Sequence, residues 1–193
     1  MSPLASVEHL PAAHAPIAGM QQAEFDRIWE ALDALTDPEI PVVTLREMGI
    51  LRDVRRGLDG TIEAVITPTY SGCPAMEQIA DDVAAALERE GVTGRVVTQL
   101  APAWTTDWMT DVAREKLRAY GIAPPHCAST ATQGSVIQFS SNRISAKTQA
   151  HAVSCPQCGS ANTTEISHFG STACKALYRC LDCMEPFDHF KRI

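Results

Sequence analysis

The chain has 193 residues, of which 45% are hydrophobic, so it can form one ordinary hydrophobic core and a smaller second module. Its formal net charge is -7, and the balanced charges after residue 151 add no basic surplus, which argues against nucleic-acid binding. No apolar run approaches the roughly 20 residues of a membrane span and no signal-peptide pattern begins the chain, so we expect a cytoplasmic protein without membrane contact.

Residues 1–20 show no periodic apolar pattern and are expected to be a disordered extension. The pattern of residues 21–122 predicts an α+β domain in which helices and a short mixed sheet follow the order α-β-β-α-β-α. The expected elements are a helix that starts at residue 21 and ends at Asp37-Pro38, strands at 50–54 and 61–67, a helix at 74–90, a strand at 95–100 and a helix at 106–120.

Residues 123–152 are rich in Ser, Thr, Ala and Gln and are interpreted as a linker. Cys127 lies in this segment beside two prolines and has no cysteine partner at a suggestive spacing. We therefore expect no role for Cys127.

The tail at residues 153–193 carries two C-x-x-C pairs, Cys155-Pro-Gln-Cys158 and Cys180-Leu-Asp-Cys183. Each pair can turn two thiolates toward one ion, so the two pairs predict a four-cysteine metal site in a ribbon-like domain. A segment this short and this poor in large apolar residues needs such support to fold. Both zinc and an iron-sulfur cluster accept four thiolates, and Cys174 is either an additional ligand or a small buried residue.

Cys73 stands where a predicted strand leads into a predicted helix, in Thr69-Tyr-Ser-Gly-Cys73-Pro74. With Pro74 at the first helical position, Cys73 would occupy the N-cap, where the helix dipole favours a thiolate and lowers the thiol pKa. Such a thiolate can bind a soft metal or act as a nucleophile. The alternative interpretation is an inert buried cysteine.

Asp37 and Glu39 lie in a proline-stiffened loop, Asp37-Pro38-Glu39-Ile40-Pro41, that follows the first predicted helix. Their carboxylates can serve as hard ligands, as a base or as charge partners of a bound metal. The alternative is that they only end the helix and remain solvated.

The segment from the Asp37-Pro-Glu loop through Tyr70-Ser-Gly-Cys73-Pro resembles the small domain of iron-sulfur cluster assembly and carrier proteins, including the SufT-like factors. This resemblance spans roughly residues 25–121 and implies that Cys73 is the functional thiol. The remaining motifs resemble the D-subunit (PaaD-like) family of the bacterial phenylacetyl-CoA epoxidase system. They are Pro102-Ala-Trp-Thr-Thr-Asp-Trp108, Cys155-Pro-Gln-Cys-Gly-Ser, Phe169-Gly-Ser-Thr-Ala-Cys-Lys-Ala-Leu-Tyr-Arg-Cys180 and Glu185-Pro-Phe-Asp.

The resemblance implies a non-catalytic accessory subunit in aerobic phenylacetate breakdown, which helps to load iron or a cluster into the oxygenase or its reductase. The sequence agrees, because it lacks both paired Glu-x-x-His helices for a di-iron site and a glycine-rich loop for a flavin or nicotinamide. A transient iron-sulfur cluster would be bound by Cys73, with Asp37 and Glu39 shaping the site. One thiol cannot hold a cluster alone, so a second chain in a homodimer, the tail cysteines, a small thiol or a client must contribute.

Two other hypotheses remain open from the sequence. The chain could be a structural adaptor that docks on the oxygenase without metal transfer, with Trp104 and Trp108 either anchoring that interface or packing in the core. It could instead be a thiol oxidoreductase that uses Cys73, although no resolving cysteine lies close in the sequence.

Overall fold

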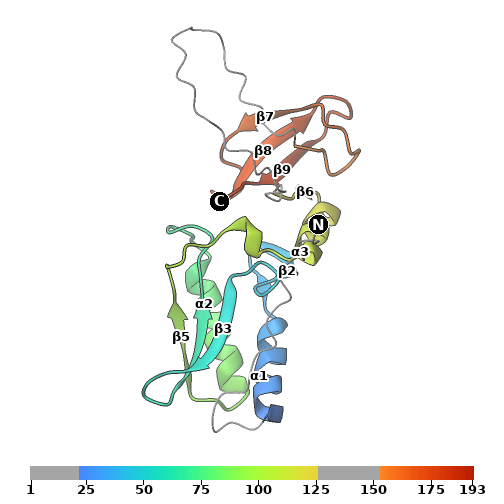
Figure 1. The fold of residues 1–193 in the computed structure, drawn as a ribbon. Coiled ribbons are helices and arrows are strands. Elements are labelled where there is room, and N and C mark those ends of the chain that lie inside the picture. The colour runs from blue at the N-terminus through green and yellow to red at the C-terminus, as the bar shows by residue number, and fades with distance from the viewer. Residues whose placement is uncertain (1–21, 126–152) are drawn as a thin grey trace, which may run out of the picture.

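The computed structural model describes residues 22–125 and 153–193 (Figure 1). The predicted extension at 1–20, most of the predicted linker and Cys127 lie outside the described residues. Among the described residues, no helix is long and apolar enough to cross a membrane.

The first half of the chain forms the α+β domain that the sequence predicts, with its mixed three-stranded sheet. Its elements are α1 (Gln22–Asp33), β1 (Thr36–Asp37), β2 (Ile40–Thr44), β3 (Leu51–Arg56), β4 (Ile62–Ile66), α2 (Met76–Arg89), β5 (Gly94–Thr98), η1 (Thr106–Trp108) and α3 (Asp111–Tyr120). The sheet has the order β3-β4-β5, in which β4 pairs antiparallel with β3 and parallel with β5. The short hairpin of β1 and β2 is an addition to the predicted order, and the first helix ends at Asp33, before the predicted end at Asp37-Pro38, because Thr36–Asp37 pairs with β2 as a strand.

The core of this domain follows from the apolar spacing of its two long helices. The buried positions of α1 and α2 recur every three or four residues, and β4 is buried along its whole length. The helical positions are Phe25, Ile28, Trp29 and Leu32 in α1, and Ile79, Val83, Ala86 and Leu87 in α2. Each large apolar side chain stabilises the fold by roughly 1.5–3 kcal/mol when it is fully buried.

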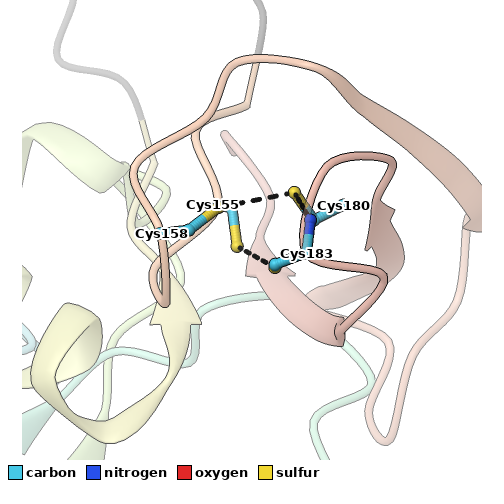
Figure 2. A group of neighbouring side chains, drawn as sticks. All are labelled: Cys155, Cys158, Cys180 and Cys183. Atoms are coloured by element: carbon cyan, nitrogen blue, oxygen red, sulfur yellow. Dashed lines mark hydrogen bonds between the residues drawn. The ribbon is translucent and has the colours of Figure 1, made fainter.

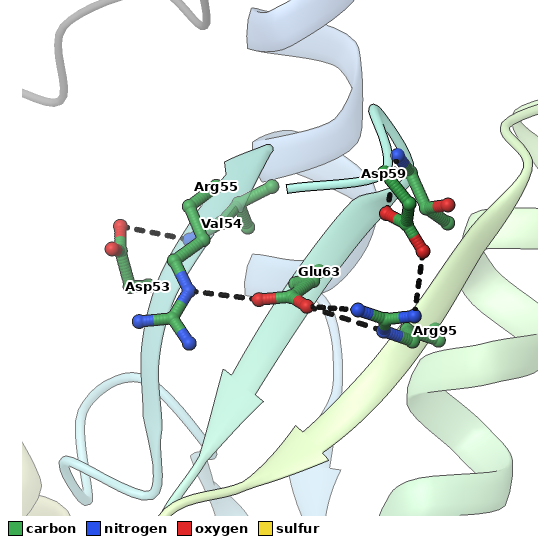
Figure 3. A network of polar contacts seen from close by, with 7 residues as sticks. Asp53, Val54, Arg55, Asp59, Glu63 and Arg95 are labelled. Carbon is green, nitrogen blue, oxygen red and sulfur yellow. Dashed lines mark hydrogen bonds and ion pairs between the residues drawn. The ribbon is translucent and has the colours of Figure 1, made fainter. Parts of the chain in front are cut away.

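A polar network ties the three strands of this sheet together (Figure 3). The carboxylate of Glu63 in β4 accepts hydrogen bonds from Arg55 in β3 at 2.9 Å and from Arg95 in β5 at 2.6 Å. Arg95 also donates to Asp59 at 2.8 Å. The hydrogen bond from Arg95 lowers the pKa of Glu63 most, and the one from Arg55 is the next cause. The fold therefore stabilises the charged form of Glu63.

The predicted helix at 106–120 is two separate elements, because the backbone of Met109 and Thr110 is extended between η1 and α3. Thr110 caps α3 by accepting a hydrogen bond from the backbone N–H of Ala113 at 3.1 Å. The helix ends at Gly121, whose φ of 94° is readily adopted only by glycine.

The second half of the chain adds β7 (Thr163–Ser167), β8 (Lys175–Cys180) and β9 (Pro186–Phe190). These strands form one sheet with β6 (Ile122–Ala123), in the order β6-β9-β8-β7. β6 comes directly after α3 and pairs parallel with β9. A strand of the first half therefore completes the sheet of the ribbon, and the sheet includes Ala123, which the sequence assigned to the linker.

The ribbon also shares the hydrophobic core of the first domain. Cys174 and Phe190 belong to the same buried cluster as α1 and α2. Trp104 packs against Phe190 and donates its indole N–H to the carbonyl of Met48 at 3.0 Å. Trp104 is thus a core residue that joins the two halves. Of the two roles considered for it, the structure supports packing in the core.

Candidate functional site

The two C-x-x-C pairs bring four sulfur atoms together at one end of the ribbon (Figure 2). The sulfurs of Cys155, Cys158, Cys180 and Cys183 all lie within 4.8 Å of one another. Across the pairs, Cys155 Sγ is 3.7 Å from Cys183 Sγ, and Cys158 Sγ is 3.6 Å from Cys180 Sγ. Both pairs lie in tight turns, and the second turn follows directly on β8, which ends at Cys180.

This spacing suits a single tetrahedral ion. Metal–sulfur bonds of about 2.3 Å at tetrahedral angles place neighbouring sulfurs about 3.8 Å apart. An iron-sulfur cluster puts several atoms between its cysteine pairs and therefore requires a wider separation. The donor set fits one metal ion that is bound by four thiolates.

A backbone N–H supports the thiolate form of Cys180. For Cys183, the backbone hydrogen bond of Glu185 lowers the pKa, but desolvation and side-chain hydrogen bonds with the other three cysteines outweigh it and raise the pKa to about 12. The N–H of Cys183 points at Cys180 Sγ at 3.5 Å, and hydrogen bonding from that N–H is the largest cause that lowers the pKa of Cys180, to about 7. Few apolar residues lie around the four cysteines, and a small cluster of Ala123, Val153 and Phe187 backs Cys155 and Cys180. This small core agrees with the expectation that metal contributes to folding.

Cys174 is not part of the four-cysteine group. It is 5% exposed and packs in the core of the first domain, while the four-cysteine group contains the other cysteines of the ribbon. His168 and His189 also lie outside the group, with contacts to Glu165 and to the carbonyl of Ala123.

The structure corrects two predictions about Cys73. The helix α2 begins at Met76 with Ala75 at the N-cap, so Cys73 lies in the loop before the cap. Burial raises the pKa of Cys73 above its ordinary value, and a hydrogen bond from the N–H of Ala75 only partly offsets this. The predicted lowering of the pKa is therefore wrong, because desolvation outweighs the helix terminus. Glu39 and Asp37 raise it further.

Asp37 is buried and Glu39 is half-buried, so they are not simply solvated helix-end residues. Asp37 is 7% exposed and accepts hydrogen bonds from the N–H groups of Glu39 at 2.7 Å and Ile40 at 3.1 Å. Burial raises the pKa of both carboxyl groups, and for Glu39 the charge of Asp37 is the next cause. The negative charges of Glu39 and Asp37 both act on the thiol of Cys73.

The ribbon contributes residues to this site that the sequence did not single out. Lys175 in β8 is 4% exposed, and its charge lowers the pKa of both Asp37 and Glu39. The hydroxyl of Thr172 is a further, smaller cause that lowers the pKa of Glu39, and it lies 3.0 Å from Cys174 Sγ. The only sequence signal for these contacts is their position around Cys174 in the Phe-Gly-Ser-Thr-Ala-Cys-Lys motif.

Two family models match different parts of this chain. Residues 26–99 match a family described as iron-sulfur cluster assembly protein, and residues 140–191 match the PaaD zinc beta ribbon domain. An Escherichia coli protein named as the D component of 1,2-phenylacetyl-CoA epoxidase is 46% identical over 92% of this chain and 98% of its own. The chain belongs to the PaaD-like family.

Other relatives match about half of this PaaD-like chain. Fe-S protein maturation auxiliary factors of Porphyromonas gingivalis and Bacillus subtilis are 35% and 32% identical. They match 50% and 49% of this chain, and 91% and 94% of their own chains. Because the match covers nearly all of these relatives, their chains are too short to contain a second module such as the ribbon.

Solved structures of similar domains also cover half of the PaaD-like chain. A DUF59 domain from Bacillus anthracis is 28% identical with a TM-score of 0.44, and covers 50% of this chain and 93% of its own. A conserved hypothetical protein from Thermotoga maritima is 24% identical with a TM-score of 0.40, and covers 48% of this chain and 91% of its own.

Proposed function

We propose that this PaaD-like protein is a non-catalytic accessory factor of a phenylacetyl-CoA epoxidase, which delivers iron or an iron-sulfur cluster to the oxygenase or reductase subunits. The single observation that carries the proposal is the half-buried thiol of Cys73 together with the buried Asp37 and the half-buried Glu39, whose negative charges raise its pKa. All three residues lie in the part of the chain that matches iron-sulfur cluster assembly proteins. The names of the relatives support the same role.

The chemistry of this site suits a transient cargo. A thiolate is a good ligand for iron, and carboxylates add negative charge that attracts the cation. In the absence of a cation, the raised pKa of Cys73 keeps its thiol protonated at neutral pH. Binding of the cation then requires the thiol to lose its proton, which lowers the affinity at neutral pH. A cation held in this way is easier to release than one bound by four thiolates.

The four-cysteine group has a different role in this proposal. We assign it to a resident zinc ion bound by Cys155, Cys158, Cys180 and Cys183, because its sulfur spacing fits one tetrahedral ion. Zinc has no redox chemistry and fixes the two turns of the ribbon. The ribbon would then position Thr172 and Lys175 against the Cys73 loop. A reducing cytoplasm would keep the six described cysteines free, as they are in the structure.

The test is maturation of the client proteins in cells. The oxygenase and reductase subunits are co-expressed with the wild-type chain, with Cys73→Ser or with Cys127→Ser as the matched control. We expect Cys73→Ser to lower the iron and sulfide content of a purified client, together with epoxidase activity, and Cys127→Ser to leave them unchanged. Equal metal content of the clients with wild-type and Cys73→Ser protein would contradict the proposal.

The adaptor hypothesis is the second candidate, because the ribbon exposes large apolar side chains. Phe169 and Ile166 are 64% and 53% exposed, as at a surface that binds a partner. An adaptor needs these residues but not Cys73. Replacing both by Ser would then abolish copurification with the oxygenase, while Cys73→Ser would keep full epoxidase activity.

A further inference from the structure

The ribbon and the loop that carries Cys73 line a common cavity of about 560 Å³. Tyr70 of that loop forms one side, and the rest of the lining belongs to the ribbon. Residues that pair across antiparallel strands point to the same face of a sheet. Two such pairs form the floor of the cavity: Glu165 with Tyr178, and Ala176 with His189. Both halves of the chain therefore contribute to the cavity, and one face of the ribbon sheet provides its floor.

Aromatic rings make up much of the cavity wall. The ring of Tyr178 lies edge-on to that of His189, with 5.4 Å between the ring centroids. The ring of Phe169 lies edge-on to that of His168 at 5.2 Å, and Phe169 is 64% exposed. Exposed aromatic side chains around a hollow are typical of surfaces that bury an apolar side chain of a partner.

The acidic side chain in the lining already has partners within the ribbon. The hydroxyl of Tyr178 donates to the carboxylate of Glu165 at 3.0 Å. Nδ1 of His168 lies 3.3 Å from the same carboxylate. The negative charge of Glu165 is therefore engaged inside the chain.

Two cations of the lining have no such carboxylate partner. Nζ of Lys191 lies 4.5 Å from the centre of the Phe169 ring and donates to the carbonyl of His168 at 3.2 Å. Arg192 is exposed. Within the described parts of the chain, neither cation forms an ion pair. The side-chain charge that the cavity offers to a partner is therefore positive, although the whole chain has a formal net charge of -7.

We propose that this cavity binds an acidic segment of a client protein, with an aromatic or aliphatic side chain of that segment placed among the rings. Carboxylates of the segment pair with Lys191 and Arg192. This inference rests on the proposed function, because it names the surface that holds the protein to which the cargo is delivered. A second copy of this chain is a poorer fit, since two chains of the same net charge repel each other.

Docking at this cavity places the client next to the thiol of Cys73. Cys73 does not line the cavity itself, but its N–H donates to the carbonyl of Tyr70 at 3.2 Å in the same turn. A client segment that contacts the ring of Tyr70 is therefore one turn of the chain away from the cargo site. This arrangement suits a cargo that moves from Cys73 to ligands of the client.

The cavity would distinguish this chain from the shorter relatives. The two maturation factors match about half of this chain over nearly their whole length, so they have no room for the ribbon residues that line the cavity. They would have to bind their clients through other surfaces.

The experiment measures binding of the full, zinc-loaded chain to the purified oxygenase and reductase subunits. Lys191→Glu/Arg192→Glu reverses both cations, and Phe169→Ser removes the exposed ring. We expect each change to raise the Kd for the bound subunit by at least about tenfold, because like charges or a lost apolar contact oppose docking. Zinc content and thermal melting confirm that each variant is folded.

The matched control is Arg89→Glu/Arg118→Glu, which reverses two exposed charges on α2 and α3. The control changes the net charge by the same amount, so it accounts for long-range repulsion. It should leave the Kd within about twofold, because salt screens charges that lie far from the interface. Unchanged affinity of the cavity variants, or binding of neither subunit by the wild type, overturns the inference.

The docking surface and the cargo site can fail separately. After anaerobic reconstitution of the chain alone, the cavity variants should retain as much iron and sulfide as the wild type. Normal client binding by the cavity variants, with less client iron in Cys73→Ser, overturns the docking surface and leaves the proposed function standing. Weak client binding by the cavity variants, with full client iron in Cys73→Ser, contradicts the proposed function and leaves the docking surface standing.

A photo-crosslinking amino acid in the cavity identifies the bound segment directly. Phe169 is replaced by p-benzoylphenylalanine, the protein is irradiated together with the client subunit, and the cross-linked peptides are mapped by mass spectrometry. We expect the main cross-link to join this position to a client segment rich in Asp and Glu. A main cross-link to a second copy of this chain, or to a client segment without acidic residues, would overturn the proposal.

Discussion

The ring of Trp104 packs against the ring of Phe190 with 6.0 Å between the ring centroids. Trp104 lies between β5 and η1 of the first domain, and Phe190 lies in β9, the last strand of the ribbon. The contact lies within one buried cluster, and the backbone N–H of Thr106 donates to the carbonyl of Ile193 beside it. The core of the first domain therefore continues into the ribbon, which fixes the ribbon segment that carries Cys174 and Lys175.

The first prediction concerns this shared core. Replacing Phe190 by Ala should lower the free energy of unfolding by about 3–5 kcal/mol, because the residue is 1% exposed and its removal leaves a cavity. The matched control is Phe169→Ala, whose ring is 64% exposed and should change stability by less than about 0.5 kcal/mol. Urea denaturation measures both. Equal stability of the two variants would show that the halves do not share a core.

The second prediction concerns metal removal. A chelator should abolish the hydrogen-exchange protection of β7 and of the Cys180 end of β8, because only the small cluster around Cys155 and Cys180 supports this end of the ribbon without its ion. β9 should keep more of its protection, since Phe190 packs in the core of the first domain. α1 and α2 should remain protected, since their core is large. Cys180→Ser should act like the chelator, whereas Cys127→Ser should not. A ribbon that stays protected in chelator would exclude a structural role for the metal.

The third prediction concerns acid stability. The pKa of Glu63 is lowered in the fold by its hydrogen bonds with Arg95 and Arg55. Its stabilising effect is therefore complete above the ordinary glutamate pKa of about 4.3 and is lost as the pH falls through the lower folded value. Glu63→Gln should be less stable than wild type at pH 7, and the difference should shrink with acidification. A difference that stays constant down to pH 2 would refute this assignment.

The fourth prediction concerns the thiol of Cys73. Its alkylation rate should rise with pH around a midpoint above the ordinary cysteine pKa of about 8.5, because burial raises its pKa. Glu39→Gln removes a negative charge beside the thiol and should lower that midpoint. Glu77→Gln is the matched control, since Glu77 is exposed on α2. Mass spectrometry of the Cys73 peptide gives the rates, and a midpoint that Glu39→Gln leaves unchanged would contradict the proximity of the two groups.

The elements that could be predicted from sequence are those with a strong local pattern. The apolar spacing of Phe25, Ile28 and Leu32 is sufficient to predict α1. The spacing of the two C-x-x-C pairs is sufficient to predict the four-cysteine group. The hairpin of β1 and β2 was missed because its strands are short and contain Pro41.

The Cys73 site was predicted only in part, because its character depends on packing between distant segments. Local sequence places Cys73 at a strand-to-helix loop, but burial by the surrounding core decides the direction of its pKa shift. No local pattern indicates that Lys175 of the ribbon lowers the pKa of Asp37 and Glu39, or that Thr172 lowers the pKa of Glu39. Those contacts follow from β6 pairing with β9 and from the shared core.

The most direct test of the central claim is the content of zinc, iron and acid-labile sulfide after anaerobic reconstitution with ferrous iron and sulfide. The account predicts a single zinc ion per chain in both wild type and Cys73→Ser, with iron and sulfide retained by the wild type and lost from the variant. Equal iron and sulfide in the two proteins, or none in either, would contradict a cargo site at Cys73.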